Sequence, residues 1–317
     1  MSQTGPRFNG SGCKLKLSGQ NDGDHWAGVT LPPGIRSGPV LIAGPTASGK
    51  SALALHIART FGGLIINADA LQVFAGWPVL TAQPGPADLA RAPHALYGHI
   101  PYDATYSVGH WLRDVAPLLQ GPDRPIIVGG SGLYFTALTT GLAVIPPVPS
   151  QIRRSADAMT LAQLVSVLDQ ATISKIDTHN RARVQRAAEV FMATSRTLTD
   201  WQADTPAPLL PLGDCTALAL YPPVDWLNAR IIARFDIMLD QGALAEAAGM
   251  RPHWNPAHLS AKAIGAAALI AHLDGQLSLA KAREAAIIAS RQYAKRQRTW
   301  LRARMQGWTA IDPALRP

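Results

Sequence analysis

The fold is decided by residues 39–51, which read PVLIAGPTASGKS. The apolar run from Pro39 to Ala43 has the composition of a buried parallel strand. Residues 44–51, GPTASGKS, fit the pattern G-x-x-x-x-G-K-[ST] of a phosphate-binding P-loop. Residues 51–61 are rich in Ala and Leu and stop at two glycines, which predicts a helix with a glycine C-cap. Strand, loop and helix thus follow in the order that a P-loop requires.

A loop of this kind binds phosphate through its backbone. Its N–H groups and the helix N-terminus surround the anion and favour negative charge. The Lys50 side chain would neutralise more of that charge, and the Ser51 hydroxyl would hold Mg²⁺ as a cofactor. The residues expected to bind a diphosphate in this way are Gly44, Thr46, Ala47, Ser48, Gly49, Lys50 and Ser51.

Three more apolar runs, at residues 64–67, 125–128 and 216–220, indicate further strands. Helical or turn-rich sequence separates them, and this alternation is typical of a parallel sheet. We therefore expect the fold class α/β, a P-loop NTPase-like parallel sheet with helices on both faces and an inserted small helical domain.

Proline-rich segments mark the insertion, because IPPVP occupies residues 145–149 and three prolines fall within residues 206–211. The first residues are rich in Gly, Ser, Asn and Asp and have no signal-peptide core. The expected division is a flexible tail over 1–38, a P-loop core over 39–144 and 209–317 that includes C-terminal basic helices, and an inserted helical subdomain over 145–208.

The composition is that of a globular protein, since 47% of the 317 residues are hydrophobic and 16% are charged. The longest apolar stretches, such as residues 263–273, are shorter than the roughly 18 residues that a membrane span needs. Cys13 and Cys215 have neither metal-ligand spacing nor a disulfide pattern. We expect a cytoplasmic monomer that does not associate with membranes.

The formal net charge of +8 is concentrated near the C-terminus. Residues 281–304 contain eight Lys or Arg against the single acid Glu284. Such a segment suits RNA, because each phosphate contact releases counterions. A solvated helix face would have the same composition, and the charge alone leaves both interpretations open.

Two further features bear on the chemistry. An ordinary P-loop NTPase needs a strand that ends in Asp, whereas the strand at 125–128 runs into residues 129–132, GGSG. The same P-loop could bind a diphosphate leaving group in a reaction that does not hydrolyse ATP. Asp69 follows the strand at 64–67, and strand carboxyl ends face the ligand crevice in open α/β sheets. By position it is either a catalytic carboxylate or the cap of a turn.

In order and spacing, these segments resemble the tRNA dimethylallyltransferase family. The resemblance covers roughly residues 39–302. The segments that carry it are GPTASGKS, NADALQVF at 67–74, TAQP at 81–84, VGGSGLYFTAL at 128–138, NRARVQRAAE at 180–189, Arg230, Ile231, Arg234, Met238, Gly242, KAIG at 262–265 and RQYAKRQRTW at 291–300.

The resemblance implies transfer of a dimethylallyl group from dimethylallyl diphosphate to N6 of the adenosine next to the anticodon, with the tRNA anticodon loop as partner. It implies that Asp69 is the general base, that Ser131 stands where a catalytic Thr is usual, and that Arg234 grips the diphosphate. By the same resemblance, the P-loop core is the catalytic part and the subdomain over 145–208 contacts the tRNA. The residues expected to bind tRNA are Ala70, Leu71, Gln72, Arg153, Ala182, Arg183, Val184, Gln185, Arg186, Lys295 and Arg298.

The chain departs from the family pattern at several positions. Family members usually carry Ser at Ala70, Tyr at Phe74, Lys at Gln83 and Thr at Ser131, and Tyr followed by a basic residue at 266–267, where this chain has two alanines. Ser131 keeps the hydroxyl, but the two alanines remove potential RNA contacts. Three other functions remain open from the sequence: a P-loop small-molecule kinase or NTPase, an isopentenyltransferase acting on free adenine nucleotides, and an RNA-binding protein that has lost catalysis.

Overall fold

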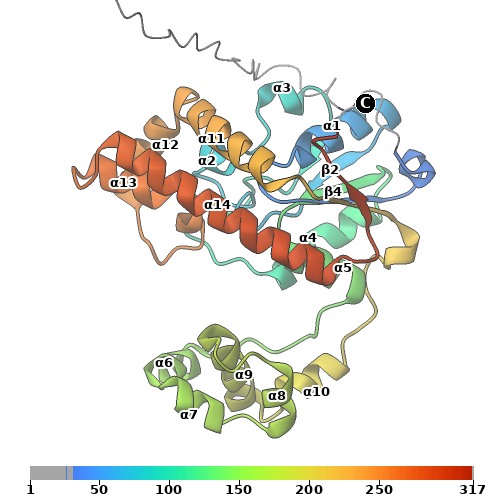
Figure 1. The fold of residues 1–317 in the computed structure, drawn as a ribbon. Coiled ribbons are helices and arrows are strands. Elements are labelled where there is room, and N and C mark those ends of the chain that lie inside the picture. Colours follow the sequence, from blue (N-terminus) through green and yellow to red (C-terminus); the bar gives the residue numbers. More distant parts are fainter. Residues whose placement is uncertain (1–25, 27–30, 316–317) are drawn as a thin grey trace, which may run out of the picture.

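The computed structural model describes Trp26 and residues 31–315. Its centre is a six-stranded sheet in the order β3-β2-β4-β1-β5-β6, and every strand pair is parallel (Figure 1). The strands are β1 (Val40–Ala43), β2 (Leu64–Asn67), β3 (His94–Ala95), β4 (Pro125–Gly129), β5 (Thr216–Leu220) and β6 (Thr309–Ile311). The predicted α/β fold class is confirmed.

The four strands predicted from apolar runs form the inner part of this sheet, and all four predictions are confirmed. The two edge strands were not predicted. β3 has only two residues, and β6 has three, of which Thr309 and Ala310 are exposed. Edge strands this short present neither a continuous apolar run nor an alternating pattern.

Alternating side chains of β1 separate the core into two layers. Val40 and Ile42 point to the face covered by α1 (Lys50–Phe61). Leu41 and Ala43 point to the other face, which is covered by α4 (Val108–Leu119), α5 (Gly132–Thr140) and the end of α14 (Leu279–Arg304). The two faces follow from the two-residue side-chain period of a strand. Helices therefore cover both faces, as the sequence predicted.

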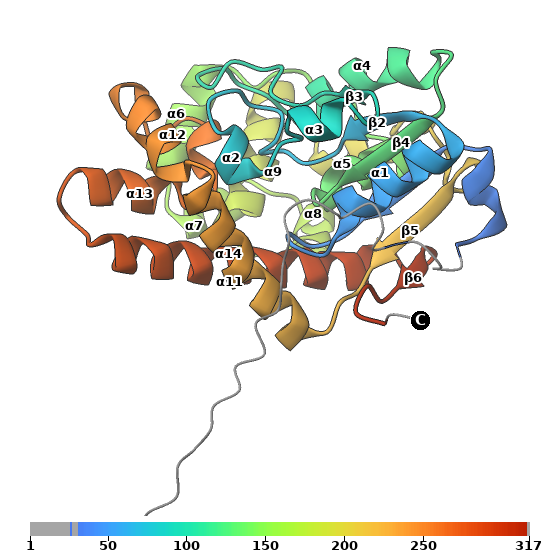
Figure 2. The same cartoon turned by 90° about the horizontal axis from the view of Figure 1, so that it is seen from above.

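A third apolar cluster lies beside the sheet, where the C-terminal helices pack on one another. Figure 2 shows α14 running along the molecule, with α11 crossing it and α13 beside it. The elements of this part are α2 (Pro78–Thr81), α11 (Val224–Asp240), α12 (Ala243–Met250), α13 (Ala266–Leu273) and the 3-10 helices η3 (Arg251–His253) and η4 (Ser260–Lys262). Two short elements lie outside it, namely α3 (Pro86–Leu89) and the 3-10 helix η2 (Leu212–Asp214), whose Leu212 packs in the layer of α4 and α5. Within the described part of the chain, no helix has the length and apolar content needed to cross a membrane.

Five helices form a separate lobe that two extended segments join to the core (Figure 1). They are α6 (Ser150–Ala158), α7 (Leu161–Ser166), α8 (Gln170–Lys175), α9 (Arg181–Thr194) and α10 (Leu198–Ala203). The lobe has its own apolar cluster around Ala156, Leu164, Val184 and Ala188. All five helices lie inside the range given above for the inserted subdomain.

The predicted flexible tail is wrong for the residues of that range that the structure describes. Trp26 and Ile35 are each only 2% exposed and pack in the cluster beneath α1. Ile35 belongs to the 3-10 helix η1 (Pro33–Arg36), and Arg124 Nη1 donates a hydrogen bond to its carbonyl at 2.6 Å. Two isolated apolar side chains give no periodic signal, although each fills a gap in the core. The rest of residues 1–30 lie outside the described residues.

Candidate functional site

The P-loop connects β1 to α1 with a strained backbone. Gly49 has φ +89°, a left-handed conformation that glycine adopts without steric cost, and Ala47 has φ +63°. Lys50 is the first residue of α1, and its Nζ lies 3.4 Å from the carbonyl oxygen of Pro45. The loop thus curls around its own lysine at the N-terminus of a 12-residue helix, which is where an anion is favoured.

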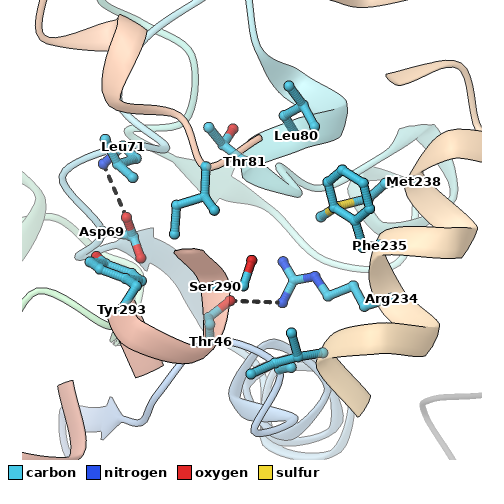
Figure 3. A pocket seen from close by; sticks show the side chains of 13 residues that line it. Thr46, Asp69, Leu71, Leu80, Thr81, Arg234, Phe235, Met238, Ser290 and Tyr293 are labelled. Atoms are coloured by element: carbon cyan, nitrogen blue, oxygen red, sulfur yellow. Dashed lines mark hydrogen bonds between the residues drawn. The ribbon is translucent and has the colours of Figure 1, made fainter. Parts of the chain in front are cut away.

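A cavity of about 550 Å³, open solvent at its mouth included, lies beside this loop (Figure 3). Its walls come from the P-loop, the segment after β2, α2, α11 and α14. The lining residues are Thr46, Ala47, Asp69, Leu71, Leu80, Thr81, Ile231, Arg234, Phe235, Met238, Ile264, Ser290 and Tyr293. Figure 3 shows Arg234 and Thr46 at one end and Leu80, Phe235 and Met238 at another.

One buried cation, one partly buried cation and one carboxylate set the charge of the site. Burial lowers the pKa of Lys50 to about 8, the charge of Asp69 raises it again in part, and Arg234 lowers it further. Burial also lowers the pKa of Arg234, whose Nη1 lies 3.4 Å from the Thr46 hydroxyl. Two positive groups beside one negative group leave a net positive charge when both cations are protonated, so the site is suited to an anionic ligand.

Asp69 caps a turn and lines the cavity at the same time. Its Oδ1 accepts a hydrogen bond from the Leu71 N–H at 3.0 Å, and its own N–H donates to Asn67 Oδ1 at 2.8 Å. The side chain is 8% exposed and is part of the cavity wall. The two interpretations open from the sequence are therefore compatible, because one carboxylate oxygen fixes the turn and leaves the other for the cavity.

Ser131 lies at the end of β4, as the N-cap of α5. Its Oγ accepts a hydrogen bond from the Ala70 N–H at 2.8 Å, so its hydroxyl proton remains available for donation. The Tyr293 hydroxyl contacts Ser131, and the charge of Asp69 and burial together raise the pKa of Tyr293. Ser131 is thus beside the cavity wall, although it is not among the lining residues.

The structure brings only some predicted phosphate-binding residues to the cavity. Thr46, Ala47 and Arg234 line it. Ser48 is completely buried in the loop, so it can offer a ligand only its backbone. Ser51 is exposed at the second position of α1 and does not line the cavity.

The predicted tRNA-binding residues of the lobe lie mostly on its surface. Arg153, Arg183 and Arg186 are exposed. The guanidinium of Arg186 is nevertheless partly enclosed, and this burial lowers its pKa. The charge of Glu189 raises the pKa and that of Arg153 lowers it further, so cations of α6 and α9 lie near one another. Val184 is completely buried in the lobe core, so the predicted tRNA contact would have to use its backbone. A helical segment of five residues inevitably turns one of them inward.

The remaining predicted contacts fall near the cavity and on α14. Leu71 lines the cavity, and Gln72 Nε2 donates hydrogen bonds to the carbonyls of Thr81 and Ala82 at 2.8 and 2.9 Å. On α14, Lys295 is exposed and Arg298 is partly exposed. Burial and the neighbouring Arg302 both lower the pKa of Arg298. Cations thus gather on the outer side of this helix.

Two departures from the family pattern have structural counterparts. Gln83 Nε2 donates to the Phe74 carbonyl at 2.8 Å, which fastens the segment after Asp69. Ala266 is completely buried at the start of α13, and only Ala267 is exposed. A side chain added at 266 would enter the core.

Sequence reasoning missed the apolar wall and two residues of α14. Ile231, Phe235 and Met238 recur on one face of α11 around Arg234, and a cation inside an apolar stripe is a signal that marks a ligand-facing helix. Tyr293 and Gln297 gave no such signal, because they lie in a segment dominated by its basic residues.

A P-loop at the carboxyl edge of a parallel sheet, beside a cavity that Arg234 lines, defines an α/β protein of the P-loop class. Residues 72–304 match the family described as IPP transferase. The chain is 58% identical over 275 residues to a tRNA dimethylallyltransferase of Ruegeria sp. (strain TM1040), covering 87% of this chain and 96% of that one. It therefore belongs to the IPP transferase family.

Solved structures agree with this fold. A full-length tRNA isopentenylpyrophosphate transferase from Bacillus halodurans superposes with a TM-score of 0.63 at 27% identity, covering 87% of this chain and 90% of that chain. A eukaryotic dimethylallyltransferase acting on tRNA gives a TM-score of 0.76 at 23% identity, covering 87% and 74%. At that identity the second likeness concerns the fold alone.

Proposed function

We propose that this protein transfers the dimethylallyl group of dimethylallyl diphosphate to N6 of the adenosine next to the anticodon in tRNA, releasing diphosphate. The observation that carries this proposal is the division of one cavity into a cationic and an apolar end. Arg234 and Thr46 line the first, and Leu80, Phe235 and Met238 line the second. A diphosphate joined to a branched five-carbon chain has the same two parts.

Stabilisation of the leaving group is the main task of the protein groups. The N6 amine of adenine is a weak nucleophile because its lone pair is delocalised into the ring, so the electrophile must be made reactive. Lys50 and Arg234 neutralise the charge that develops as the carbon–oxygen bond breaks and the electron pair leaves with the diphosphate. The Ser131 hydroxyl donates a hydrogen bond to the bridging oxygen, while the Ala70 N–H holds its Oγ in place.

The residues present fit Mg²⁺ through the substrate rather than through a protein cage. In the described part of the chain, no group of three His, Cys, Asp or Glu could hold a metal ion. Mg²⁺ commonly keeps several waters and binds substrate phosphates with one or two protein oxygens. The Ser51 hydroxyl at the N-terminus of α1 would offer one such oxygen, although it is exposed and is not part of the cavity lining. When bound, the ion would neutralise phosphate charge.

Asp69 takes the proton that N6 releases. Forming the carbon–nitrogen bond makes the N6 proton strongly acidic, so a carboxylate of ordinary basicity accepts it if it lies within hydrogen-bond reach. The turn that holds Asp69 fixes the carboxylate at the cavity wall. The adenine must leave its stack to reach this wall, and extrusion from a single-stranded loop is less costly than extrusion from a duplex.

Basic side chains on the lobe and on α14 support a tRNA substrate over a free nucleotide. Arg153 and Arg183 are exposed on the lobe, and Lys295 is exposed on α14. A mononucleotide would not reach cations on both parts, whereas phosphates of one RNA stem and loop would.

The proposal is tested by incubating the protein with dimethylallyl diphosphate labelled in the allyl group. With tRNA, we expect label in the RNA and one diphosphate released per group transferred, and nuclease digestion should yield N6-dimethylallyladenosine. Transfer to free AMP at an equal rate, or ATP hydrolysis without transfer, would overturn the proposal.

The base is tested with Asp69→Asn, which keeps the oxygen that accepts from the Leu71 N–H. We expect a loss of at least ~100-fold in turnover with tRNA affinity unchanged. Asp103→Asn, a change at an exposed acid outside the cavity, serves as the matched control. Wild-type turnover in Asp69→Asn would exclude Asp69 as the base.

A further inference from the structure

Gln297 of α14 joins the two loops that carry the site. Its Oε1 accepts a hydrogen bond from the Thr46 N–H at 2.8 Å, and its Nε2 donates one to the Gly130 carbonyl at 3.0 Å. The side chain is only 6% exposed. A buried amide with both ends hydrogen-bonded is held in one conformation, because breaking either bond leaves a polar group unpaired away from water.

The glycines of the loop at 129–132 make room for this contact. A Cβ on Gly130 would lie 2.1 Å from Gln297 Nε2 and 3.2 Å from Asp69 Oδ2. A Cβ on Gly132 would lie 2.0 Å from the Trp300 ring. The inner face of α14 is therefore seated directly on the loop that presents Ser131, and no side chain separates them.

Each end of the amide touches a chemically active element. Thr46 follows Pro45 in the phosphate loop, and its hydroxyl contacts Arg234. Gly130 directly precedes Ser131 in the chain. The Gln297 side chain thus sets the distance between the phosphate loop beside Arg234 and the Ser131 hydroxyl, which is proposed to act on the leaving oxygen. The uncharged amide supplies one acceptor and one donor for these two partners.

The same helix presents cations on its outer side. Lys295 is exposed two residues before Gln297, and Arg298 is partly exposed one residue after it. A shift of α14 caused by a polyanion on its outer side would therefore be transmitted to Thr46 and Gly130. This connects the RNA surface to the geometry of the active site through one side chain.

We propose that Gln297 is a positioning residue for the transfer reaction, which holds the diphosphate cradle and the Ser131 loop in register beneath the RNA-facing helix. The inference rests on the proposed function. It assigns no contact with substrate to Gln297. Its effect is therefore on the rate of the bound complex rather than on the binding of either substrate.

The first variant is Gln297→Met, which keeps the length of the side chain and removes both hydrogen bonds. We expect kcat to fall about 10- to 100-fold, the scale of a small misplacement of reacting groups. The dissociation constants of tRNA and dimethylallyl diphosphate should stay within about threefold, since neither substrate loses a partner. Gln292→Met, at an exposed glutamine of the same helix, is the matched control and should behave as wild type.

The second variant, Gln297→Glu, separates positioning from a general packing defect. The ionised side chain accepts from Thr46 but repels the Gly130 carbonyl, whereas the protonated side chain donates to Gly130 and restores both bonds. Burial favours the protonated form. We expect kcat relative to wild type at equal pH to rise as the pH falls from 8.5 to 6, above the value for Gln297→Met.

The outcomes are distinguishable. A kcat for Gln297→Met within twofold of wild type, or a Gln297→Glu ratio that is flat with pH, would overturn the positioning role while transfer by the wild-type protein stands. If Gln297→Met does not fold, the pH dependence of kcat for Gln297→Glu relative to wild type tests the positioning role by itself. A wild-type protein that transfers no allyl group would instead overturn the proposed function, and this inference with it.

Discussion

The pKa of Lys50, lowered to about 8 chiefly by burial, predicts that diphosphate binding weakens as the pH rises above neutrality. The free protein binds the ligand best when Lys50 is protonated, because the ammonium neutralises phosphate charge. Below pH 8 the group is mostly charged and affinity is at its full value. Above pH 8 the group is mostly neutral, and protonating it upon binding consumes part of the binding free energy.

The magnitude follows from the fraction of protein in the binding-competent form. With a pKa of about 8, the protonated fraction is roughly 0.9 at pH 7 and roughly 0.1 at pH 9, so the apparent dissociation constant rises about tenfold. A phosphate ester ionises near pH 6, so the charge of the ligand is nearly constant over this range. An ordinary lysine with a pKa of 10.5 would give a change of only a few per cent over this range.

The measurement is calorimetric titration of the protein with dimethylallyl diphosphate, without tRNA, from pH 7 to 9. Buffers of different ionisation enthalpy should reveal proton uptake of about half a proton per ligand at pH 8. Arg234→Met is the matched control, and it should bind more weakly but with the midpoint shifted upward, because Arg234 lowers the pKa of Lys50. A dissociation constant for wild type that is unchanged between pH 7 and 9 would refute the reasoning.

Three further outcomes are expected. Ser131→Ala should lower kcat about 10- to 100-fold while Ser131→Thr, which keeps the hydroxyl, stays near wild type; equal defects would exclude the hydroxyl. Replacing Lys295 and Arg298 by Ala should reduce the slope of log K against log[salt] for tRNA by roughly 1 to 2, with diphosphate affinity unchanged as the control. Glu246→Gln should raise the KM for dimethylallyl diphosphate about threefold, because Glu246 accepts from the Val79 and Leu80 N–H groups and so holds the apolar wall; an unchanged KM would contradict this role.

The sequence was most informative where local pattern and tertiary structure agree. The strand, loop and helix at residues 39–61 follow from an apolar run, a glycine pattern and a glycine stop, and the structure has each of them. The inner strands were recognisable for the same reason, since strands covered on both faces are continuous apolar runs. The short edge strands β3 and β6 form only because a neighbouring strand offers its backbone.

The site was predictable for residues tied to a motif and less so for residues that reach it from afar. Arg234 was identified through resemblance, and the structure explains its place beside Thr46. Gln297 lies 251 residues from Thr46, and its amide has no special position in the pattern of α14. The apolar wall is likewise assembled from α2, α11 and the loop before α13, which no local window contains.

The missing strand-end Asp and the glycines that replace it have one physical explanation. A Cβ on Gly129 would lie 2.0 Å from the Ala68 carbonyl oxygen, and a Cβ on Gly130 would lie 2.1 Å from the Gln297 amide. An acidic side chain at the end of β4 would therefore displace either the segment that leads to Asp69 or helix α14. A hydrolase needs that carboxylate to hold a metal ion and orient water. Here the space is occupied by the backbone and amide groups that hold Asp69 and Ser131, so the P-loop adjoins the proposed base and the proposed hydroxyl donor instead of a water-activating acid.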